Sequence, residues 1–194
     1  MIFDSHTHRT DSGYALINVE PGFAPEPEYY YSIGIHPWHA DRVTGADLTK
    51  LEAQAVLPQV KAIGETGLDR NTPGYQQQLA LLTYHIGLSE RLHKPLLLHV
   101  VRYYNEIIQL CKRLKPTQPW IIHGFRGNPQ QTEQLLNHGF YLSLGERYNP
   151  QSAAIIPSHR LLVETDTSAI GIDSLAGNLP QYDNTLPLRL FRIN

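Results

Sequence analysis

Imidazole and carboxylate side chains directly follow short apolar segments at widely separated places in this chain of 194 residues. These side chains are His6, His8, His36, Glu65, Asp69, His99, His123 and Asp166. The chain has 10 histidines but only 1 cysteine and 1 methionine, so a metal bound here would have nitrogen and oxygen ligands rather than sulfur. A single histidine after an apolar run is a weak signal, but the joint pattern indicates a metal site.

Six of these residues are enough to hold two metal ions. One ion could be bound by His6, His8, Glu65 and Asp166. The other could be bound by Glu65, His99 and His123, with Glu65 as the bridge. Such mixed ligands suit zinc, manganese, cobalt or iron, and suit magnesium less well. Two divalent ions would polarise a phosphoryl or carbonyl oxygen and lower the pKa of a water, which Asp166 could orient and deprotonate.

The elements that must position these side chains follow an α/β pattern. Eight short apolar segments are predicted to be buried strands of a parallel sheet: Met1–Phe3, Ala15–Val19, Tyr30–Ile35, Ala62–Gly64, Leu96–Leu98, Trp120–Ile122, Phe140–Leu144 and Leu161–Val163. Helices are predicted from a cap at Asp47, over Gly74–Leu92, over Asn105–Leu114, and from Asn128 to Gly139. Because the carboxyl ends of parallel strands share one edge, the polar side chains would converge there. Side chains alternate along a strand, so a twist or bulge must turn both His6 and His8 toward the metal.

Two regions break this alternation. Only Arg9–Tyr14 separates the first two predicted strands, whereas a parallel crossover needs about a dozen or more residues. These strands are therefore expected to be antiparallel neighbours, unless the second lies outside the main sheet. After Asp166 no long amphipathic helix is predicted, because Gly171–Thr185 is rich in Gly, Asn, Asp and Pro.

Length and composition predict one globular domain over residues 1–194. The net charge of -2 argues against a strongly basic nucleic-acid binder and against an acidic disordered chain. Cys111 has no partner for an internal disulfide, and no apolar run approaches the ~20 residues of a membrane span. The first eight residues lack the zones of a signal peptide, so we expect a cytoplasmic protein without membrane contact.

The chain resembles the TatD family of metal-dependent deoxyribonucleases, part of the wider amidohydrolase-like barrel group. The matching motifs occur in family order: Asp4-Ser5-His6-Thr7-His8, Gly34-Ile35-His36-Pro37, Ile63-Gly64-Glu65-Thr66-Gly67-Leu68-Asp69, Pro95–His99, His123-Gly124-Phe125 and Glu164-Thr165-Asp166. The resemblance implies a TIM-like (β/α) barrel with two divalent metals on the six residues named above. It also implies hydrolysis of phosphodiester bonds, typically of DNA, with Asp166 and Glu65 as catalytic carboxylates. His36 and Asp69 match motif positions on the substrate side of that site.

The chain departs from the family pattern in three places. Arg9–Ile33 is short for the strand and helix pair expected there, and only 28 residues follow Asp166. Val101 stands where the family often has an arginine, and Arg102 follows one place later. We therefore expect a barrel shortened at Arg9–Ile33 and at the C-terminus, since a typical barrel of this kind has about 250 residues. A missing outer helix would expose apolar surface, which predicts marginal stability or a partner subunit, such as a homo-oligomer.

The number and placement of the arginines are compatible with a nucleic-acid substrate. The chain has 16 basic and 18 acidic residues, so a broad basic face is not expected. Arginine nevertheless outnumbers lysine 11 to 5, and several arginines follow predicted strand ends: Arg9, Arg70, Arg102, Arg126 and Arg147. Arg102 and Arg126 are our candidates for substrate binding, because arginine fits phosphate geometry and Gly124 and Gly127 flank Arg126 closely. Trp38 and Tyr103 are interpreted as packing residues, with base stacking as the alternative.

Three hypotheses follow. The first is a two-metal phosphodiesterase acting on DNA ends or single strands through a metal-activated water. The second keeps the barrel but changes the bond to that of another small substrate, such as an amide, a lactone or a phosphotriester. Many enzymes of that type bridge their metals with a modified lysine, whereas Glu65 takes the bridging place here. The third is a catalytically weak module that binds metal or nucleic acid.

Overall fold

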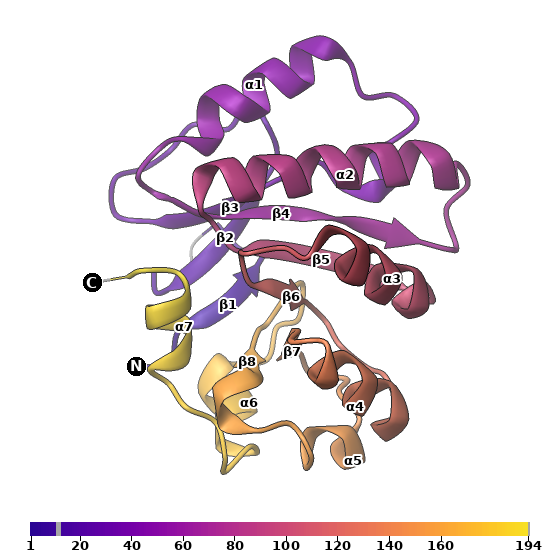
Figure 1. Ribbon diagram of the computed structural model, residues 1–194. Helices are drawn as coiled ribbons and strands as arrows, with labels where there is room; N and C mark the ends of the chain where they lie inside the picture. The colour runs from indigo at the N-terminus through magenta and orange to yellow at the C-terminus, as the bar shows by residue number, and fades with distance from the viewer. Residues whose placement is uncertain (11–12, 194) are drawn as a thin grey trace.

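Eight parallel strands form one sheet whose spatial order follows the sequence from β1 to β8 (Figure 1). The computed structural model describes residues 1–10 and 13–193. The strands are β1 (Asp4–Thr7), β2 (Ala15–Val19), β3 (Tyr30–Ile33), β4 (Val60–Asp69), β5 (Leu96–Val101), β6 (Trp120–Ile122), β7 (Tyr141–Leu144) and β8 (Leu161–Val163). Most of their residues are buried, which explains why most of the strands occur in the sequence as short apolar runs. The strand predicted at Met1–Phe3 is wrong, because β1 is the polar but buried run Asp4–Thr7 that follows it.

Helices follow each strand from β3 onward and, apart from α7, cover the outside of the sheet. They are α1 (Gly45–Ala55), α2 (Tyr75–Leu92), α3 (Tyr104–Leu114), α4 (Pro129–Asn137), α5 (Pro150–Ala153), α6 (Ile172–Gly177) and α7 (Leu186–Leu190), with 3-10 helices η1 (Pro37–His39) and η2 (Ser158–Arg160). The predicted cap at Asp47 is wrong, because Thr44 caps α1 and Asp47 is the third helical residue of a capping box. The predicted cap of α4 is confirmed at Asn128.

The sheet closes into a barrel where β1 meets the segment after β8. Thr7 and Asp166 form an isolated parallel bridge. The Asp166 N–H donates to the His6 carbonyl at 3.0 Å, and the His8 N–H donates to the Asp166 carbonyl at 3.1 Å. The predicted TIM-like barrel is confirmed. Its closing hydrogen bonds lie among the predicted metal ligands.

The amino end of the barrel is filled by the C-terminal segment. Leu186, Phe191 and Ile193 pack in one buried cluster with Phe3 and with residues of β2, β4, β5, β6 and β8. Figure 1 places α7 beside the N-terminus, at the end of the barrel opposite the arrowheads of the strands. The chain thus provides its own apolar plug at this end, although the described residues after Asp166 form only the short helices α6 and α7.

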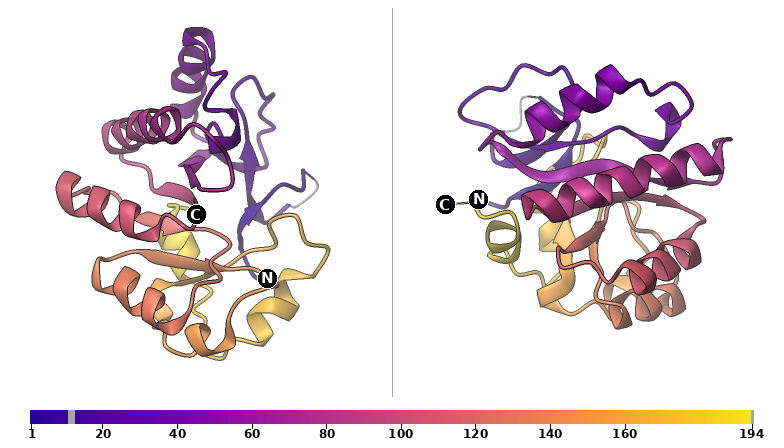
Figure 2. Two further views of the ribbon diagram at one scale, coloured as in Figure 1. Left: turned by 90° about the vertical axis from the view of Figure 1, so that its right-hand side faces the viewer. Right: turned by 45° about the horizontal axis from the view of Figure 1, so that its top comes forward.

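The expectation for β1 and β2 is wrong, because the two strands are parallel neighbours in the main sheet. The connection between Thr7 and Ala15 contains only residues 8–14, of which residues 11–12 lie outside the described part of the chain. Seven residues can span about 23 Å when extended, whereas the four-residue strand that must be retraced is about 13 Å long. A short return is therefore enough, and Figure 2 (left) shows no helix on the described segments between β1 and β3.

A coil segment covers the outer side of β3 where a helix is missing. The ring centroids of Phe23 and Tyr31 lie 4.8 Å apart. Gln54 of α1 holds this coil, because its side chain accepts from the Gly22 N–H at 2.6 Å and donates to the Phe23 carbonyl at 2.8 Å. The shortened region Arg9–Ile33 therefore still contributes to the covering of the barrel.

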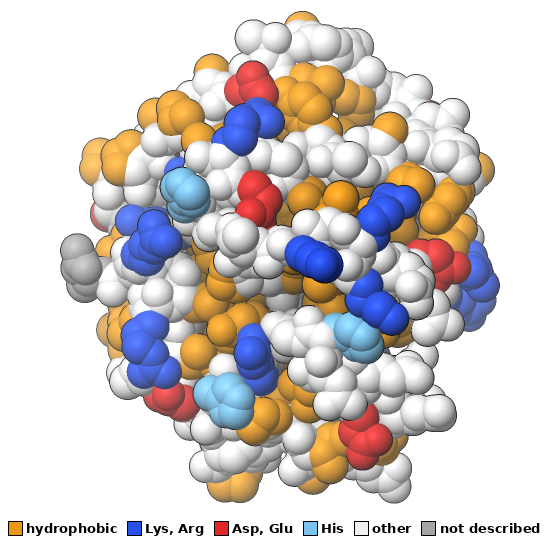
Figure 3. Space-filling view, viewed as in Figure 1, with side chains coloured by type: hydrophobic (Ala, Val, Ile, Leu, Met, Phe, Trp, Pro, Cys, Tyr) orange, Lys and Arg blue, Asp and Glu red, His pale blue; other side chains and the backbone are white. Residues whose placement is uncertain are grey.

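Charged side chains are dispersed on one face of the molecule. On the face shown in Figure 3, Lys and Arg side chains lie apart, with acidic, apolar and uncharged groups between them. This distribution agrees with the small net charge of -2. Within the described residues, none of the helices has both the length and the apolar character required to cross a membrane.

Candidate metal centre

Glu65 lies at the centre of the carboxyl end of the barrel, surrounded by imidazoles. Its carboxylate is 2.8 Å from His99 Nδ1, 2.8 Å from His123 Nε2 and 3.1 Å from His36 Nε2. It is also 3.3 Å from His8 Nε2 and 3.5 Å from His6 Nε2. The barrel thus brings together histidines that are more than 100 residues apart in the sequence, as the polar groups at the predicted strand ends indicated.

Strand β4 presents Glu65 from its interior rather than from its end. The pairing of β4 with β5 shifts register between Ile63 and Thr66. Gly64 has a φ of +128°, and a Cβ atom there would lie 2.2 Å from the Leu97 carbonyl oxygen. Gly67 has a φ of +154°, and a Cβ atom there would lie 1.9 Å from the His99 carbonyl oxygen. Glycine at both positions therefore allows the close strand contact that turns Glu65 into the mouth of the barrel.

The predicted irregularity at His-x-His is present. The pairing of β1 with β2 shifts register between Asp4 and Thr7. The rings of His6 and His8 lie 5.1 Å apart at an interplanar angle of 87°, and both approach Glu65. His6 is buried, whereas the side chain of His8 is 41% exposed and so faces the opening.

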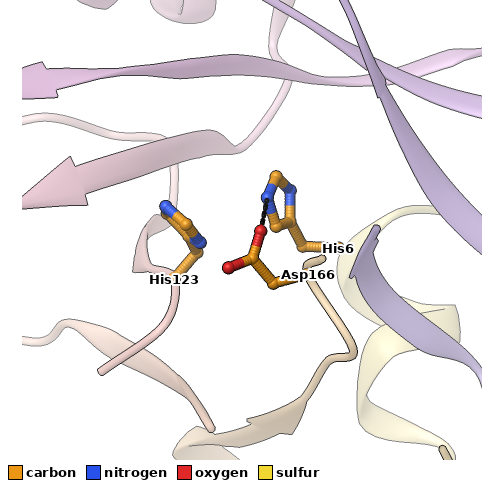
Figure 4. Close-up of side chains that lie close together, drawn as sticks. All are labelled: His6, His123 and Asp166. Atoms are coloured by element: carbon orange, nitrogen blue, oxygen red, sulfur yellow. Dashed lines mark ion pairs between the residues drawn. The ribbon is translucent and has the colours of Figure 1, made fainter. Parts of the chain in front are cut away.

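Asp166 is positioned by the hydrogen bonds that close the barrel. Its carboxylate lies between the imidazoles of His6 and His123 (Figure 4). Asp166 Oδ1 is 3.8 Å from His6 Nε2 and 3.6 Å from His8 Nε2. The side chain is 28% exposed and lines the cleft described below.

The unpartnered ring nitrogens of His6 indicate that these residues fit a metal ion. Both of its ring nitrogens are buried, and neither has a hydrogen-bond partner within the described residues. An unpaired buried nitrogen is costly unless a ligand satisfies it. Three overlapping groups have ligand atoms within 4.8 Å of one another: His6 with His123 and Asp166, His6 with His8 and Glu65, and His36 with Glu65 and His99. The division of the ligands between two ions stays a prediction.

The two residues expected on the substrate side differ in their placement. His36 is in contact with Glu65, so it belongs to the same cluster as the proposed ligands. Asp69 lies behind His99, because its Oδ2 is 3.2 Å from His99 Nε2 and accepts from the Trp38 indole N–H at 2.7 Å. Asp69 is therefore a positioning residue for His99, and its direct contact with a substrate stays a prediction.

Several buried or half-buried polar groups support the cluster and were not singled out from the sequence. Glu164 Oε1 is 3.1 Å from His123 Nδ1 and accepts from the Gly124 N–H at 2.7 Å. Asn18 on β2 accepts from the Glu65 N–H at 2.9 Å. Asp4 accepts from the Thr165 N–H at 3.0 Å and from its hydroxyl at 2.6 Å. The available signals were polar residues inside a predicted apolar strand or beside a predicted ligand.

The pKa values of the cluster follow burial and the charge of Glu65. Burial, reinforced by the nearby His123, holds the pKa of His6 well below its ordinary value. Burial opposes the charge on Glu65, but His123 and hydrogen bonds from the histidines hold its pKa well below its ordinary value. Burial likewise opposes protonation of His123, yet Glu65 and Glu164 raise its pKa. The hydrogen bond to Glu65 raises the pKa of His8.

A cleft of about 610 Å³ opens beside the cluster over β5 and β6. Its lining includes His99, His123 and Asp166 together with Arg102 and Arg126, so both predicted substrate-binding arginines face it. Both arginines are exposed.

The other three arginines differ from this pair. Arg70 lies over the ring of Tyr103 at 4.6 Å and pairs with Glu106 at 3.3 Å. Arg9 and Arg147 are not among the residues that line the cleft.

A parallel barrel with histidines and carboxylates at its carboxyl mouth defines the class of this protein as a TIM-like barrel with a candidate metal centre. The chain belongs to the TatD family, because the profile described as "TatD related DNase" matches residues 23–169.

Curated relatives carry two kinds of name. An "Uncharacterized metal-dependent hydrolase" of Buchnera aphidicola is 34% identical over 78% of this chain and 61% of its own length. A "3'-5' ssDNA/RNA exonuclease TatD" of Erwinia billingiae is 33% identical over 86% of this chain and 66% of its own length. The chain thus spans about three fifths to two thirds of these proteins.

The fold also matches solved structures. The crystal structure of YjjV, a TatD homologue from Escherichia coli K12, superposes with a TM-score of 0.78 and 22% identity. The match covers 100% of this chain and 98% of that chain. This likeness supports the barrel fold.

Proposed function

We propose that this protein is a divalent-metal-dependent phosphodiesterase that acts on the ends of single-stranded nucleic acid, with DNA as the expected substrate. The observation that carries the proposal is the placement of Glu65 within 3.5 Å of five imidazoles, next to a cleft lined by two arginines. The proposed metal ligands are His6, His8, Glu65, His99, His123 and Asp166, and His36 is close enough to join them.

The residues divide the work of hydrolysis. Bound divalent ions would supply Lewis-acid activation of the phosphoryl group and of water. Asp166 is partly exposed at the cleft, where its carboxylate can accept the proton of the attacking water. Arg102 and Arg126 can bind the phosphates of the strand in the cleft, because a guanidinium donates two parallel hydrogen bonds to phosphate oxygens. Asp69 orients His99, and Glu164 orients His123.

Two further observations support a single strand rather than a long duplex. The small net charge, and the dispersed lysines and arginines on the face shown in Figure 3, provide few contacts for an extended duplex footprint. The name of the Erwinia billingiae relative specifies an exonuclease for single-stranded DNA and RNA. The candidate metals are zinc, manganese, cobalt, iron and magnesium.

The test combines metal analysis with a nuclease assay on one purified sample. We expect the protein to retain divalent metal and to degrade single-stranded DNA faster than duplex DNA, with activity lost in chelator and restored by added metal. RNA of the same sequence is a second substrate. The variant Asp166→Asn should lose activity more than about 100-fold, because it removes both a ligand and the proton acceptor. Unchanged cleavage by Asp166→Asn after chelation would overturn the proposal.

The alternatives give other outcomes of the same assay. Glu65 rather than a lysine lies at the centre of the cluster, and no lysine is among the residues that line the cleft. This favours the phosphodiesterase over an amide- or lactone-cleaving hydrolase with a modified lysine. Bound metal without turnover of DNA, RNA or bis(p-nitrophenyl) phosphate would instead identify a binding module.

A further inference from the structure

The indole ring of Trp38 lies exposed beside the proposed metal centre and is held in one orientation. Trp38 is 58% exposed. Its Nε1–H donates a 2.7 Å hydrogen bond to Asp69 Oδ2, and its ring packs nearly perpendicular to His36 with centroids 4.5 Å apart. One edge of the indole is therefore fixed by the site while much of the ring faces solvent.

These contacts distinguish Trp38 from Tyr103, the other aromatic candidate at the mouth. The ring of Tyr103 is half-buried and is covered by the guanidinium of Arg70 at 4.6 Å. Trp38 contributes little to the core, because it lies in the three-residue helix η1 (Pro37–His39) and remains largely open to water. A large apolar ring fixed in this way gains free energy when a flat ligand covers it.

Trp38 lies near the expected path of a bound nucleic-acid strand. Its ring centroid is 6.1 Å from that of His99, and His99 in turn lines the cleft of about 610 Å³. Trp38 follows β3, whereas the cleft lies over β5 and β6. A strand whose phosphate reaches Glu65 from the cleft therefore brings its next nucleotide toward the indole.

We infer that Trp38 is the stacking platform for a nucleobase next to the scissile phosphodiester, with the adjoining nucleotides in the cleft. The inference rests on the proposed function of this site. Every base has a flat π face, so such a platform holds a strand without strong sequence preference. It requires an unpaired base, since a base within a duplex is already stacked and paired.

A set of matched substrates separates base stacking by Trp38 from a purely structural role of Trp38 in the site. One single-stranded DNA hexamer carries all its bases, and matched hexamers carry an abasic residue at one position in turn. We expect the wild type to cleave the complete hexamer with a kcat/KM about 5- to 100-fold higher than the hexamer that is abasic at the stacked position. Trp38→Ala should reduce this ratio to about one, and Trp38→Phe should retain a large part of it.

The ratio is informative because a purely structural role of Trp38 would lower both rates together and leave the ratio unchanged. Discrimination by Trp38→Ala equal to that of the wild type would therefore overturn the inference. The absence of discrimination in the wild type at every position would also overturn it.

Fluorescence gives a second readout that does not depend on turnover. The chain has 2 tryptophans, and Trp120 is only 3% exposed. In the variant Trp120→Phe the tryptophan emission, excited at a wavelength that tyrosine does not absorb, comes from Trp38 alone. A hydrolysis-resistant phosphorothioate hexamer added to the metal-loaded protein should quench this emission, and the hexamer that is abasic at the stacked position should not.

The two readouts keep the stacking inference and the proposed function distinguishable. Quenching without cleavage of any nucleic acid would support stacking and overturn the nuclease. Cleavage without quenching and without discrimination against abasic ends would overturn stacking alone. The absence of both binding and cleavage would overturn both.

Discussion

At the scale of single residues, one carboxylate lies among five histidines that differ in their protonation. Burial holds the pKa of His6 well below its ordinary value and lowers that of His36, whereas contact with Glu65 raises the pKa of His8 and, against burial, that of His123. His6 and His36 are therefore neutral at neutral pH. A neutral imidazole is the form that binds a metal, because the lone pair of its nitrogen must be free. The same burial that makes these histidines costly without a ligand therefore prepares them for a metal.

Glu164 provides a test of how the proposed ligands are oriented. It is fully buried, and its Oε1 faces His123 Nδ1 at 3.1 Å, which leaves His123 Nε2 directed at Glu65. Glu164→Gln keeps the shape but removes the charge that favours this orientation. We expect the metal affinity, measured by competition with a coloured chelator, to fall about 10- to 100-fold.

The matched control is Glu133→Gln, which changes the net charge equally at an exposed position of α4. It should bind metal as the wild type does. Wild-type affinity in Glu164→Gln would show that His123 does not need this partner.

The residue types alone indicated which side chains would converge, but not which would support the others. His6, His8, Glu65, His99, His123 and Asp166 all follow or lie in apolar runs, and strand topology brings them together. Glu164 lies two residues before Asp166 in the same motif, yet it faces the back of His123. Whether a carboxylate lies in front of an imidazole or behind it depends on the local turn of the chain, which composition and spacing do not specify.

At the scale of elements, β4 shows where sequence patterns fall short. The apolar run predicted a strand over Ala62–Gly64, whereas β4 extends over Val60–Asp69. Glu65, Thr66 and Asp69 are buried polar residues that interrupt the apolar pattern, and Gly67 has little strand propensity. The strand nevertheless persists because β5 pairs with it along its length. Tertiary pairing thus overrides local propensity at the site itself.

His85 on α2 links a helix to the site and provides a prediction for pH dependence. The Ile35 N–H donates to His85 Nε2 at 3.0 Å, and His85 Nδ1 donates to the Leu81 carbonyl at 2.8 Å. Burial lowers the pKa of His85 to about 4, against 6.5 in an unfolded chain. As the pH falls from 7 toward 4, the unfolded chain gains a proton that the folded protein does not accept. Stability should therefore decrease, by about 2–3 kcal/mol at pH 4.5 from this group alone.

The comparison that isolates His85 is the variant His85→Gln. Glutamine can still accept from the Ile35 N–H, but it does not titrate in this range. Urea unfolding in chelator at pH 7 and pH 4.5 should show a smaller loss of stability for the variant than for the wild type, by about 2–3 kcal/mol. Equal losses would mean that His85 is protonated in the folded protein at pH 4.5.

At the scale of the whole molecule, the shortened regions are covered in different ways. The coil around Phe23 packs on β3 and is tied to α1, and the C-terminal segment enters the amino end of the barrel. Among the described residues, the exposed large apolar side chains lie in separate places: Met1, Trp38, Val56, Leu114 and Ile155. A partner subunit over the barrel stays a prediction, which sedimentation of the purified protein can check.

The parallel pairing of β1 with β2 was not predictable from the length of their connection. The expected minimum for a crossover assumes that a helix fills it. Here β1 has only four residues, so a connection of seven residues is long enough for the return. The family motifs, by contrast, indicated the barrel correctly, because they record the order of the strand ends rather than the length of the connections.

The plug at the amino end predicts that stability and metal binding can be separated. Phe191 is 1% exposed, and its ring lies 6.1 Å from that of Phe3 inside the barrel. Phe191→Ala should lower the free energy of unfolding by about 3–5 kcal/mol, because it removes buried area and leaves a cavity. The metal content of the folded fraction should stay that of the wild type, since the ligands lie at the opposite end of the strands. Urea unfolding in chelator measures the first quantity without the contribution of bound metal. Val56→Ala is the control, because Val56 is 61% exposed and should change stability by less than about 0.5 kcal/mol. A loss of metal from folded Phe191→Ala protein would instead show that the plug also sets the geometry of the mouth.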